Sequence, residues 1–171
     1  MSSLLDIVEI TAGAHLPAEH YGARAQTLGR LLAQDIPVPK GFAISTAAVR
    51  KLALGEPVDL SPLADIFAPG RLWSIRRAPQ RREWGGPRAL LNLGMTDANR
   101  AHLADTLGQT AAADQYCRFI RTYSLKVARL DEDDLEELVE AEFTTKGLCH
   151  SHLAEKLLEF YADETGEPFP Q

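Results

Sequence analysis

Residues 72–97 read L-W-S-I-R-R-A-P-Q-R-R-E-W-G-G-P-R-A-L-L-N-L-G-M-T-D, and this stretch decides how the sequence is interpreted. Apolar residues at its start (Leu72, Trp73 and Ile75) and the run from Ala89 to Met95 each predict a β-strand. Arginines gather at and between these strands: Arg71, Arg76, Arg77, Arg81, Arg82 and Arg88. Guanidinium groups held between two strands, with Gly85 and Gly86 allowing close backbone approach, suit a polyanion such as a nucleoside triphosphate. The alternative is a solvated loop whose arginines keep the protein soluble.

A second stretch, residues 21–45, reads Y-G-A-R-A-Q-T-L-G-R-L-L-A-Q-D-I-P-V-P-K-G-F-A-I-S, and the chain ends in G-E-P-F-P-Q. Together with residues 74–97, these segments resemble the N-terminal nucleotide-binding domain of the pyruvate phosphate dikinase and phosphoenolpyruvate synthase family. That family reads G-G-K-G-A-N-L-A-E-M, then L-P-V-P-P-G-F-T-I-S, then S-V-R-S-G and L-N-L-G-L-N-D, and T-G-x-x-F-P-Q at the end. The resemblance spans nearly the whole chain. It implies an α+β fold, the first half of an ATP-grasp-like domain with a small mixed sheet, flanking helices and a helical subdomain.

The resemblance also implies ATP with Mg²⁺ as the ligand and assigns residues to it. Arg24 stands at the position of the family's nucleotide-binding lysine, and Arg76 is the arginine that the family retains. We expect these two residues to bind phosphate. The remaining residues of the expected phosphate site would provide electrostatic support or close backbone approach: Arg77, Arg81, Arg82, Gly85, Gly86 and Arg88.

The sequence departs from the family pattern at positions that matter for chemistry. Ala23 and Ala25 replace glycines beside Arg24, and their methyl groups would narrow the approach of backbone amides to phosphate. Arg88 replaces an aspartate, which inverts a charge in the phosphate loop. Family members are several times longer, and further parts supply acidic metal ligands, a phosphohistidine domain and a pyruvate-binding barrel. Since phosphoryl transfer depends on positioned Mg²⁺, we expect no turnover of ATP by this chain alone.

Three functional hypotheses follow from the sequence. The first is an incomplete or degenerate ATP-binding domain that needs a protein partner to supply the second half of the cleft. The second is a non-enzymatic regulatory or interaction module that keeps the fold and uses its arginine loop to bind an acidic protein partner. The third is a separately expressed piece of a true dikinase.

The composition sets the class of protein. The chain has 171 residues, 45% of them hydrophobic, and a net charge of −6. Residues 1–130 hold sixteen Lys and Arg against eleven Asp and Glu, whereas residues 131–171 hold two against thirteen. A net acidic chain disfavours nucleic-acid binding. The N-terminus lacks the pattern of a secretory signal and no apolar run could span a bilayer, so we expect a cytoplasmic protein that does not bind membranes.

The pattern of apolar residues divides the chain near residue 96. We expect an α/β nucleotide-binding-like subdomain over 1–96, a helical subdomain over 97–165 and a tail over 166–171. Before residue 96 we expect three elements in chain order. They are a helix with apolar spacing from Tyr21 to Leu32, a strand at residues 42–44, and a helix capped by Ser45 or Thr46. A connector with one helical turn follows. Four further helices are expected after residue 96: 97–107, 110–130, 133–146 and 150–164.

Four smaller features of the sequence also bear on the site. The second of these helices carries a stripe of Tyr116, Phe119, Ile120, Tyr123 and Val127, which indicates core packing. Cys117 and Cys149 fall in helical patterns and are expected to be free, buried thiols. Cys149, His150, His152 and Glu155 superficially offer metal ligands. His150 and His152 point to different sides of a helix, and Cys149 with His152 gives fewer than the three or four ligands of a tetrahedral site, so no metal site is expected there. His15 and His20 flank the expected nucleotide helix, and ordinary surface histidines are the favoured interpretation of both.

Overall fold

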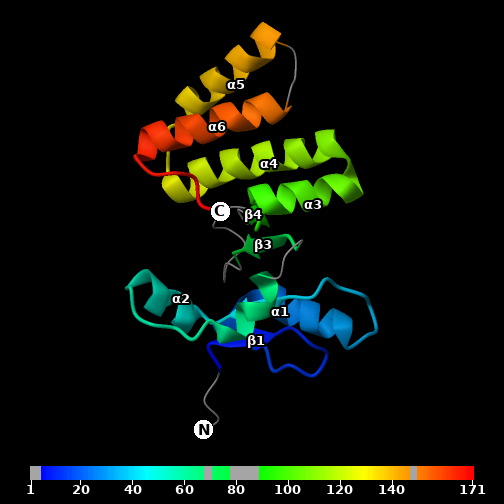
Figure 1. The fold of residues 1–171 in the computed structure, drawn as a ribbon. Coiled ribbons are helices and arrows are strands. Elements are labelled where there is room, and N and C mark those ends of the chain that lie inside the picture. Colours follow the sequence, from blue (N-terminus) through cyan, green and yellow to red (C-terminus); the bar gives the residue numbers. More distant parts are fainter. Residues whose placement is uncertain (1–4, 68–70, 78–88, 147–149) are drawn as a thin grey trace. The chain divides into compact units, whose positions relative to one another are not determined.

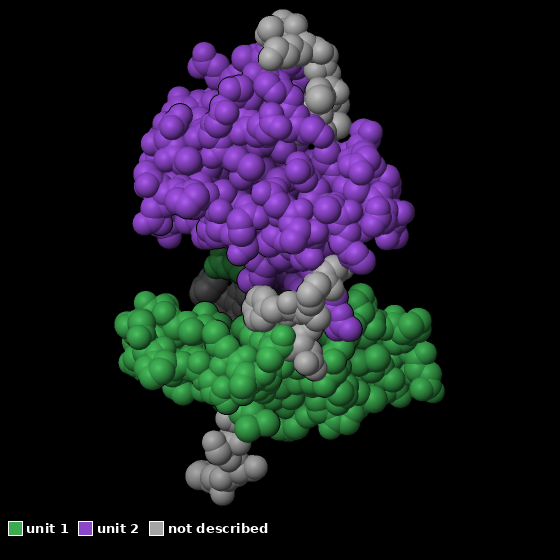
Figure 2. Space-filling view, in the orientation of Figure 1, with its two compact units in different colours: residues 1–67, 76–88 green, residues 68–75, 89–171 purple. Residues whose placement is uncertain are grey.

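The computed structural model describes residues 5–67, 71–77, 89–146 and 150–171 (Figure 1). It is a mixed α/β structure with two small antiparallel sheets of two strands each, which confirms the α+β class at this coarse level. The chain forms two compact units, shown in separate colours in Figure 2. The first comprises residues 1–67 and 76–88, and the second comprises residues 68–75 and 89–171.

The first unit is built on a short antiparallel ribbon. Strand β1 (Ile7–Glu9) pairs with β2 (Phe42–Ile44), with Ile7 opposite Ile44 and Glu9 opposite Phe42. Helix α1 (Ala18–Leu32) connects the strands, and its buried face packs with Leu16 and Ala43 in a small apolar core. The sequence predicted α1 and β2 but not β1.

Helix α2 (Thr46–Ala53) begins where the sequence predicted. Ser45 is its N-cap, since the Ser45 side chain accepts a hydrogen bond from the backbone N–H of Ala48 at 3.0 Å. The N–H of Ser45 itself donates to the carbonyl of Asp6 at 2.8 Å, which joins the helix start to the β1 side of the ribbon. A 3₁₀ helix, η1 (Ser61–Phe67), follows at the expected helical turn.

The second unit combines a β-hairpin with a helical bundle. The hairpin consists of β3 (Trp73–Arg76) and β4 (Ala89–Leu93), and all of it except Arg76 is grouped with the second unit. The helical elements follow in chain order: α3 (Asp97–Leu107), α4 (Gln109–Tyr123), the π-helical turn η2 (Ser124–Ala128), α5 (Glu132–Lys146) and α6 (His150–Thr165). In Figure 1 the long helices lie side by side in the order α3, α4, α6, α5. In the described ranges between 97 and 164, the prediction of an almost entirely helical region is confirmed.

The apolar core of the second unit contains the residues that the periodicity indicated. Phe119, Ile120, Val139 and Leu157 are buried together, and three further expected residues are partly buried against them: Tyr123, Leu138 and Leu158. Val127 is the exception, because it is 48% exposed. The regular helix gives way to the π turn after Tyr123, so a stripe drawn at α-helical spacing no longer follows the buried face. The expectation that Val127 belongs to the core was wrong.

The end of the hairpin also belongs to this core. Met95 is fully buried in it, and Leu72, Leu90 and Leu93 pack against it. The compact units therefore group residues 89–96 with the helices, whereas the sequence placed them with the N-terminal subdomain. The division into subdomains at residue 96 stays a prediction. No helix in the described ranges has both the length and the apolar character required to cross a bilayer.

Candidate functional site

The helix that carries Arg24 is interrupted one turn after it starts. Gly22 has φ 82° and ψ 153°, values outside the helical region. The N–H groups of His20 and Tyr21 both donate to the carbonyl of Pro17, so the first turn closes before Gly22. A regular helix resumes at Ala23, whose carbonyl accepts a hydrogen bond from the Thr27 hydroxyl at 2.8 Å. Gly22 is required at this position because a left-handed φ is costly for other residues.

Arg24 lies in the first turn of the resumed helix, and its side chain is exposed. The first N–H groups of a helix lack intrahelical partners, and the helix dipole places partial positive charge there. An exposed guanidinium beside such a terminus gives a donor set that fits phosphate oxygens.

The alanines beside Arg24 face different surroundings. Ala25 is buried in the core of the first unit with Leu16 and Tyr21, so its methyl group does not lie on the exposed side of the helix. Ala23 is exposed. Both alanines replace glycines of the family pattern, and their methyl groups were expected to narrow the approach of backbone amides to phosphate. Only the methyl group of Ala23 lies at a solvent-facing position near Arg24.

Tyr21 holds the start of α1 against the N-terminal segment. Its hydroxyl donates to the carbonyl of Leu5 at 2.6 Å. Burial raises the pKa of Tyr21, and the nearby carboxylate of Asp6 raises it further. The phenol therefore stays protonated and keeps its donor role, which fixes the position of the turn that ends at Gly22.

Arg76 and Arg77 lie at the end of β3, and both are exposed. Neither side chain, nor that of Arg24, makes a hydrogen bond or ion pair with another residue that the structure describes. All three belong to the same compact unit. The other expected phosphate-site residues lie outside the described part of the chain: Arg81, Arg82, Gly85, Gly86 and Arg88. Their assignment stays a prediction.

The strand that follows the arginine-rich segment is attached to the helices at two points. The ammonium group of Lys126, in η2, donates to the carbonyl of Ala89 at 2.9 Å. The side-chain amide of Asn92 donates to Oε1 of Gln115, on α4, at 2.8 Å. Asn92 has a left-handed φ of 59°, which shifts the alternation of the strand so that Leu90 and Leu93 both pack against the helical core.

The segment L-N-L-G-M-T-D forms a tight connection from β4 into α3. Gly94 has φ 93°, and a Cβ at this position would lie 3.1 Å from the carbonyl oxygen of Arg71. The side chain of Asn99 donates to the Gly94 carbonyl at 2.6 Å, and Thr96 caps α3 by accepting from the N–H of Asn99. These contacts explain why this motif has a glycine at its centre and a hydroxyl two residues later.

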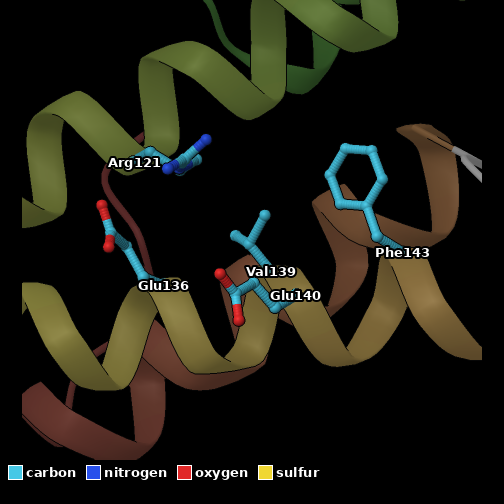
Figure 3. A pocket seen from close by; sticks show the side chains of 5 residues that line it. All are labelled: Arg121, Glu136, Val139, Glu140 and Phe143. Atoms are coloured by element: carbon cyan, nitrogen blue, oxygen red, sulfur yellow. The ribbon is translucent and has the colours of Figure 1, made fainter.

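A shallow groove lies beside α4 and α5 in the second unit (Figure 3). It has a volume of about 400 Å³ and is lined by Arg121 from α4 and four residues of α5: Glu136, Val139, Glu140 and Phe143. In Figure 3 the Arg121 side chain extends from α4 into the space between the helices. Its buried Nε has no hydrogen-bond partner among the described residues. Sequence reasoning missed this groove, although spacings of three and four residues place its α5 residues on one helix face.

The histidines and cysteines do not form a second site in the described residues. His15 and His20 are both exposed. His152 lies 3.2 Å from Glu142 and 3.6 Å from Glu155, which gives it carboxylate neighbours. No group of three or more His, Cys, Asp or Glu in the described ranges could hold a metal ion, and the side chains of Cys149 and His150 lie outside those ranges. Cys117 is buried, and burial raises the pKa of its thiol to about 11, so it is not a nucleophile at neutral pH.

Comparison of the chain with protein-family models and with curated proteins gives no match.

Proposed function

We propose that this chain is an incomplete or degenerate ATP-binding domain related to the pyruvate phosphate dikinase family. In this proposal Arg24 and Arg76 bind the phosphates of the nucleotide, and the domain forms one wall of a cleft that a protein partner completes. The observation that carries the proposal is the helix break at Gly22, which places the exposed Arg24 in the first turn of a helix. This is the arrangement that an anion site requires.

The chemistry of the described groups supports a phosphate ligand. Arg24 contributes a planar donor in the first turn of the resumed helix, and Arg76 contributes a second guanidinium at the end of a strand. Guanidinium groups bind phosphate through paired hydrogen bonds, and neither of these two is neutralised by a carboxylate within the described residues. ATP with Mg²⁺ would bring the anionic charge that this donor set lacks.

Catalysis is not part of the proposal for the isolated chain. Phosphoryl transfer is almost entirely a matter of positioning the phosphates and their metal ions. In the family that the sequence resembles, the acidic metal ligands and the phosphohistidine come from further parts of the protein. A partner must therefore supply them.

Calorimetric titration of the purified chain with ATP, ADP and pyrophosphate, with and without Mg²⁺, tests the proposal. A charge-assisted hydrogen bond is worth roughly 1.5–3 kcal/mol, so Arg24→Ala and Arg76→Ala should each weaken binding by about ten- to a hundredfold. Arg30→Ala is the matched control, because Arg30 is an exposed arginine in the last turn of the same helix. Absence of binding, or isotherms of the Arg24 and Arg76 variants that match that of the unmodified chain, would rule the proposal out.

A second candidate function is an interaction module that binds an acidic protein through the same arginines. The exposed side chains of Arg76 and Arg77, which pair with no carboxylate among the described residues, favour it, since they would suit carboxylates as well as phosphates. The titration separates the two candidates, because only the first requires nucleotide affinity.

A further inference from the structure

The groove beside α4 and α5 presents two rows of side chains, each with a spacing of one helical turn. Glu136 and Glu140 form an acidic row, and Val139 and Phe143 form an apolar row next to it. Val139 is buried, whereas Phe143 is 49% exposed. In Figure 3 Val139 and Phe143 extend from α5 into the space that Arg121 enters from α4. The groove therefore offers apolar surface directly beside carboxylates.

The length and depth of the groove suit a helix. Both α4 and α5 pack on α6, and no described residue of α6 is among those that line the groove. The lining positions on α5 run from 136 to 143, which covers about 10 Å along a helix axis. A shallow groove leaves a small ligand largely exposed, whereas a helix can lay side chains one turn apart along the apolar row.

Arg121 carries a buried polar atom at the α4 side of this groove. Its Nε has no hydrogen-bond partner among the described residues. A buried donor that lacks an acceptor is costly, so an occupant that brings an acceptor to this side gains binding energy from it. An amide oxygen is such an acceptor.

The charge of α5 determines the kind of partner that fits. Residues 131–143 contain eight Asp and Glu and no Lys or Arg. Six of the acidic residues in α5 are exposed: Glu132, Asp133, Asp134, Glu136, Glu137 and Glu140. A second copy that approached through its own α5 would bring like charges together, and nucleic acid would be repelled in the same way. A basic segment gains from these charges.

We propose that the groove beside α4 and α5 is a docking site for a basic amphipathic helix of a partner protein. Apolar side chains one turn apart on that helix cover the apolar row, lysines on one flank pair with the acidic row, and an amide side chain on the other flank accepts a hydrogen bond from Arg121. The inference goes beyond the proposed function and is independent of it. All residues of the groove belong to the second unit, whereas Arg24 and Arg76 belong to the first.

The test measures binding of a labelled, end-blocked helical peptide to the full chain by fluorescence anisotropy at about 0.15 M salt. The peptide has about 21 residues, with leucines on one face, lysines on one flank and glutamines on the other. One matched peptide replaces the lysines with glutamates, and a second keeps the composition but distributes the leucines around the helix. We expect the basic peptide to bind, the acidic peptide not to bind, and the redistributed peptide to bind at least about tenfold more weakly.

Glu136→Lys and Glu137→Lys form a matched pair that locates the peptide. Both residues are exposed on α5 and both substitutions change the net charge equally, but only Glu136 lines the groove. We expect Glu136→Lys to weaken binding of the basic peptide about five- to tenfold, and Glu137→Lys to weaken it by no more than about twofold. Equal losses would indicate general charge attraction and would overturn the inference.

Phe143→Ser tests the apolar row. It removes half-exposed apolar surface and should weaken binding of the basic peptide about five- to tenfold. Leu107→Ser is the control, because Leu107 on α3 is 48% exposed and does not line the groove, so peptide affinity should stay within about twofold. Circular dichroism and the melting temperature verify folding. If Phe143→Ser does not fold, the Glu136 and Glu137 pair decides alone.

Three outcomes of these measurements contradict the docking site. They are no binding of the basic peptide, equal binding of the redistributed peptide, and equal losses in folded Phe143→Ser and Leu107→Ser. Sedimentation of the unmodified chain as a dimer that Phe143→Ser dissociates would assign the groove to a second copy, and it would overturn the inference as well.

Discussion

The side chain of Gln171 accepts a hydrogen bond from the backbone N–H of Asp97 at 2.8 Å. Asp97 is the first residue of α3, so the last residue of the sequence satisfies one of the N–H groups at the start of a helix 74 positions earlier. Two residues before it, Phe169 packs edge-on against Phe119, Tyr123 and Tyr161, with ring centroids 5.0–5.8 Å apart. Phe169, in the tail expected over 166–171, is therefore part of the core of the second unit.

Removal of the Phe169 ring should destabilise this unit strongly. Phe169 is 6% exposed, and truncation of a buried phenylalanine to alanine costs about 3–5 kcal/mol through lost apolar burial and the cavity that remains. We expect Phe169→Ala to lower the free energy of unfolding by about 3 kcal/mol or more in urea denaturation. Pro170→Ala is the control, because Pro170 is exposed and its replacement should change stability by less than about 0.5 kcal/mol. Equal stabilities of the two variants would contradict the packing of the tail.

Substitution of Gly94 should reveal both backbone strain and a close approach. Gly94→Ala places a Cβ 3.1 Å from the Arg71 carbonyl at a left-handed φ, and it should cost about 2–3 kcal/mol of unfolding free energy. Gly55→Ala isolates the strain, because Gly55 also has a positive φ of 73° but a Cβ there meets nothing within 4 Å. It should cost about 1 kcal/mol. If Gly94→Ala were no more destabilising than Gly55→Ala, the proximity of Arg71 to Gly94 would be in doubt.

The buried thiol of Cys117 should make stability depend on pH in the alkaline range. Its pKa is raised to about 11 in the folded chain, whereas an exposed thiol titrates near about 8.5. Because the folded state holds this proton more tightly, the contribution is fully present below about pH 8.5 and is lost as the pH rises towards 11. Unfolding free energies of the unmodified chain and of Cys117→Ala should therefore converge or cross as the pH rises through that window. A constant difference between the two proteins would mean that the thiol is not shifted.

The isolated chain should not hydrolyse ATP or form phosphoenolpyruvate. The reason is the need for positioned metal ions and a second wall of the cleft, which the resemblance assigns to other parts of the family's proteins. A coupled assay for ADP and phosphate release, with Mg²⁺ present, measures this directly. Activity that follows the protein through purification and disappears in Arg76→Ala would contradict the expectation.

Local patterns in the sequence were sufficient for most of the secondary structure. Ser45 and Thr96 act as helix caps at the places where their hydroxyls precede helical spacing, and Gly108 ends α3. These features depend on residues within four positions of one another, so they can be interpreted without knowledge of the fold. The same holds for the buried side of α4 as far as Tyr123, because α-helical spacing continues to that point.

Other features depend on contacts between distant residues, and only the tertiary structure decided them. Strand β1 is held by pairing with β2, about 35 residues later. Three further features likewise depend on neighbours that the sequence does not place. They are the π turn that exposes Val127, the left-handed Asn92 bonded to Gln115, and the burial of Phe169 among other aromatic rings. The arginines that suggested a phosphate site were visible in the sequence because charge is a property of each residue. The break at Gly22 that gives Arg24 a helix terminus is a property of the folded backbone, and no residue type alone requires it.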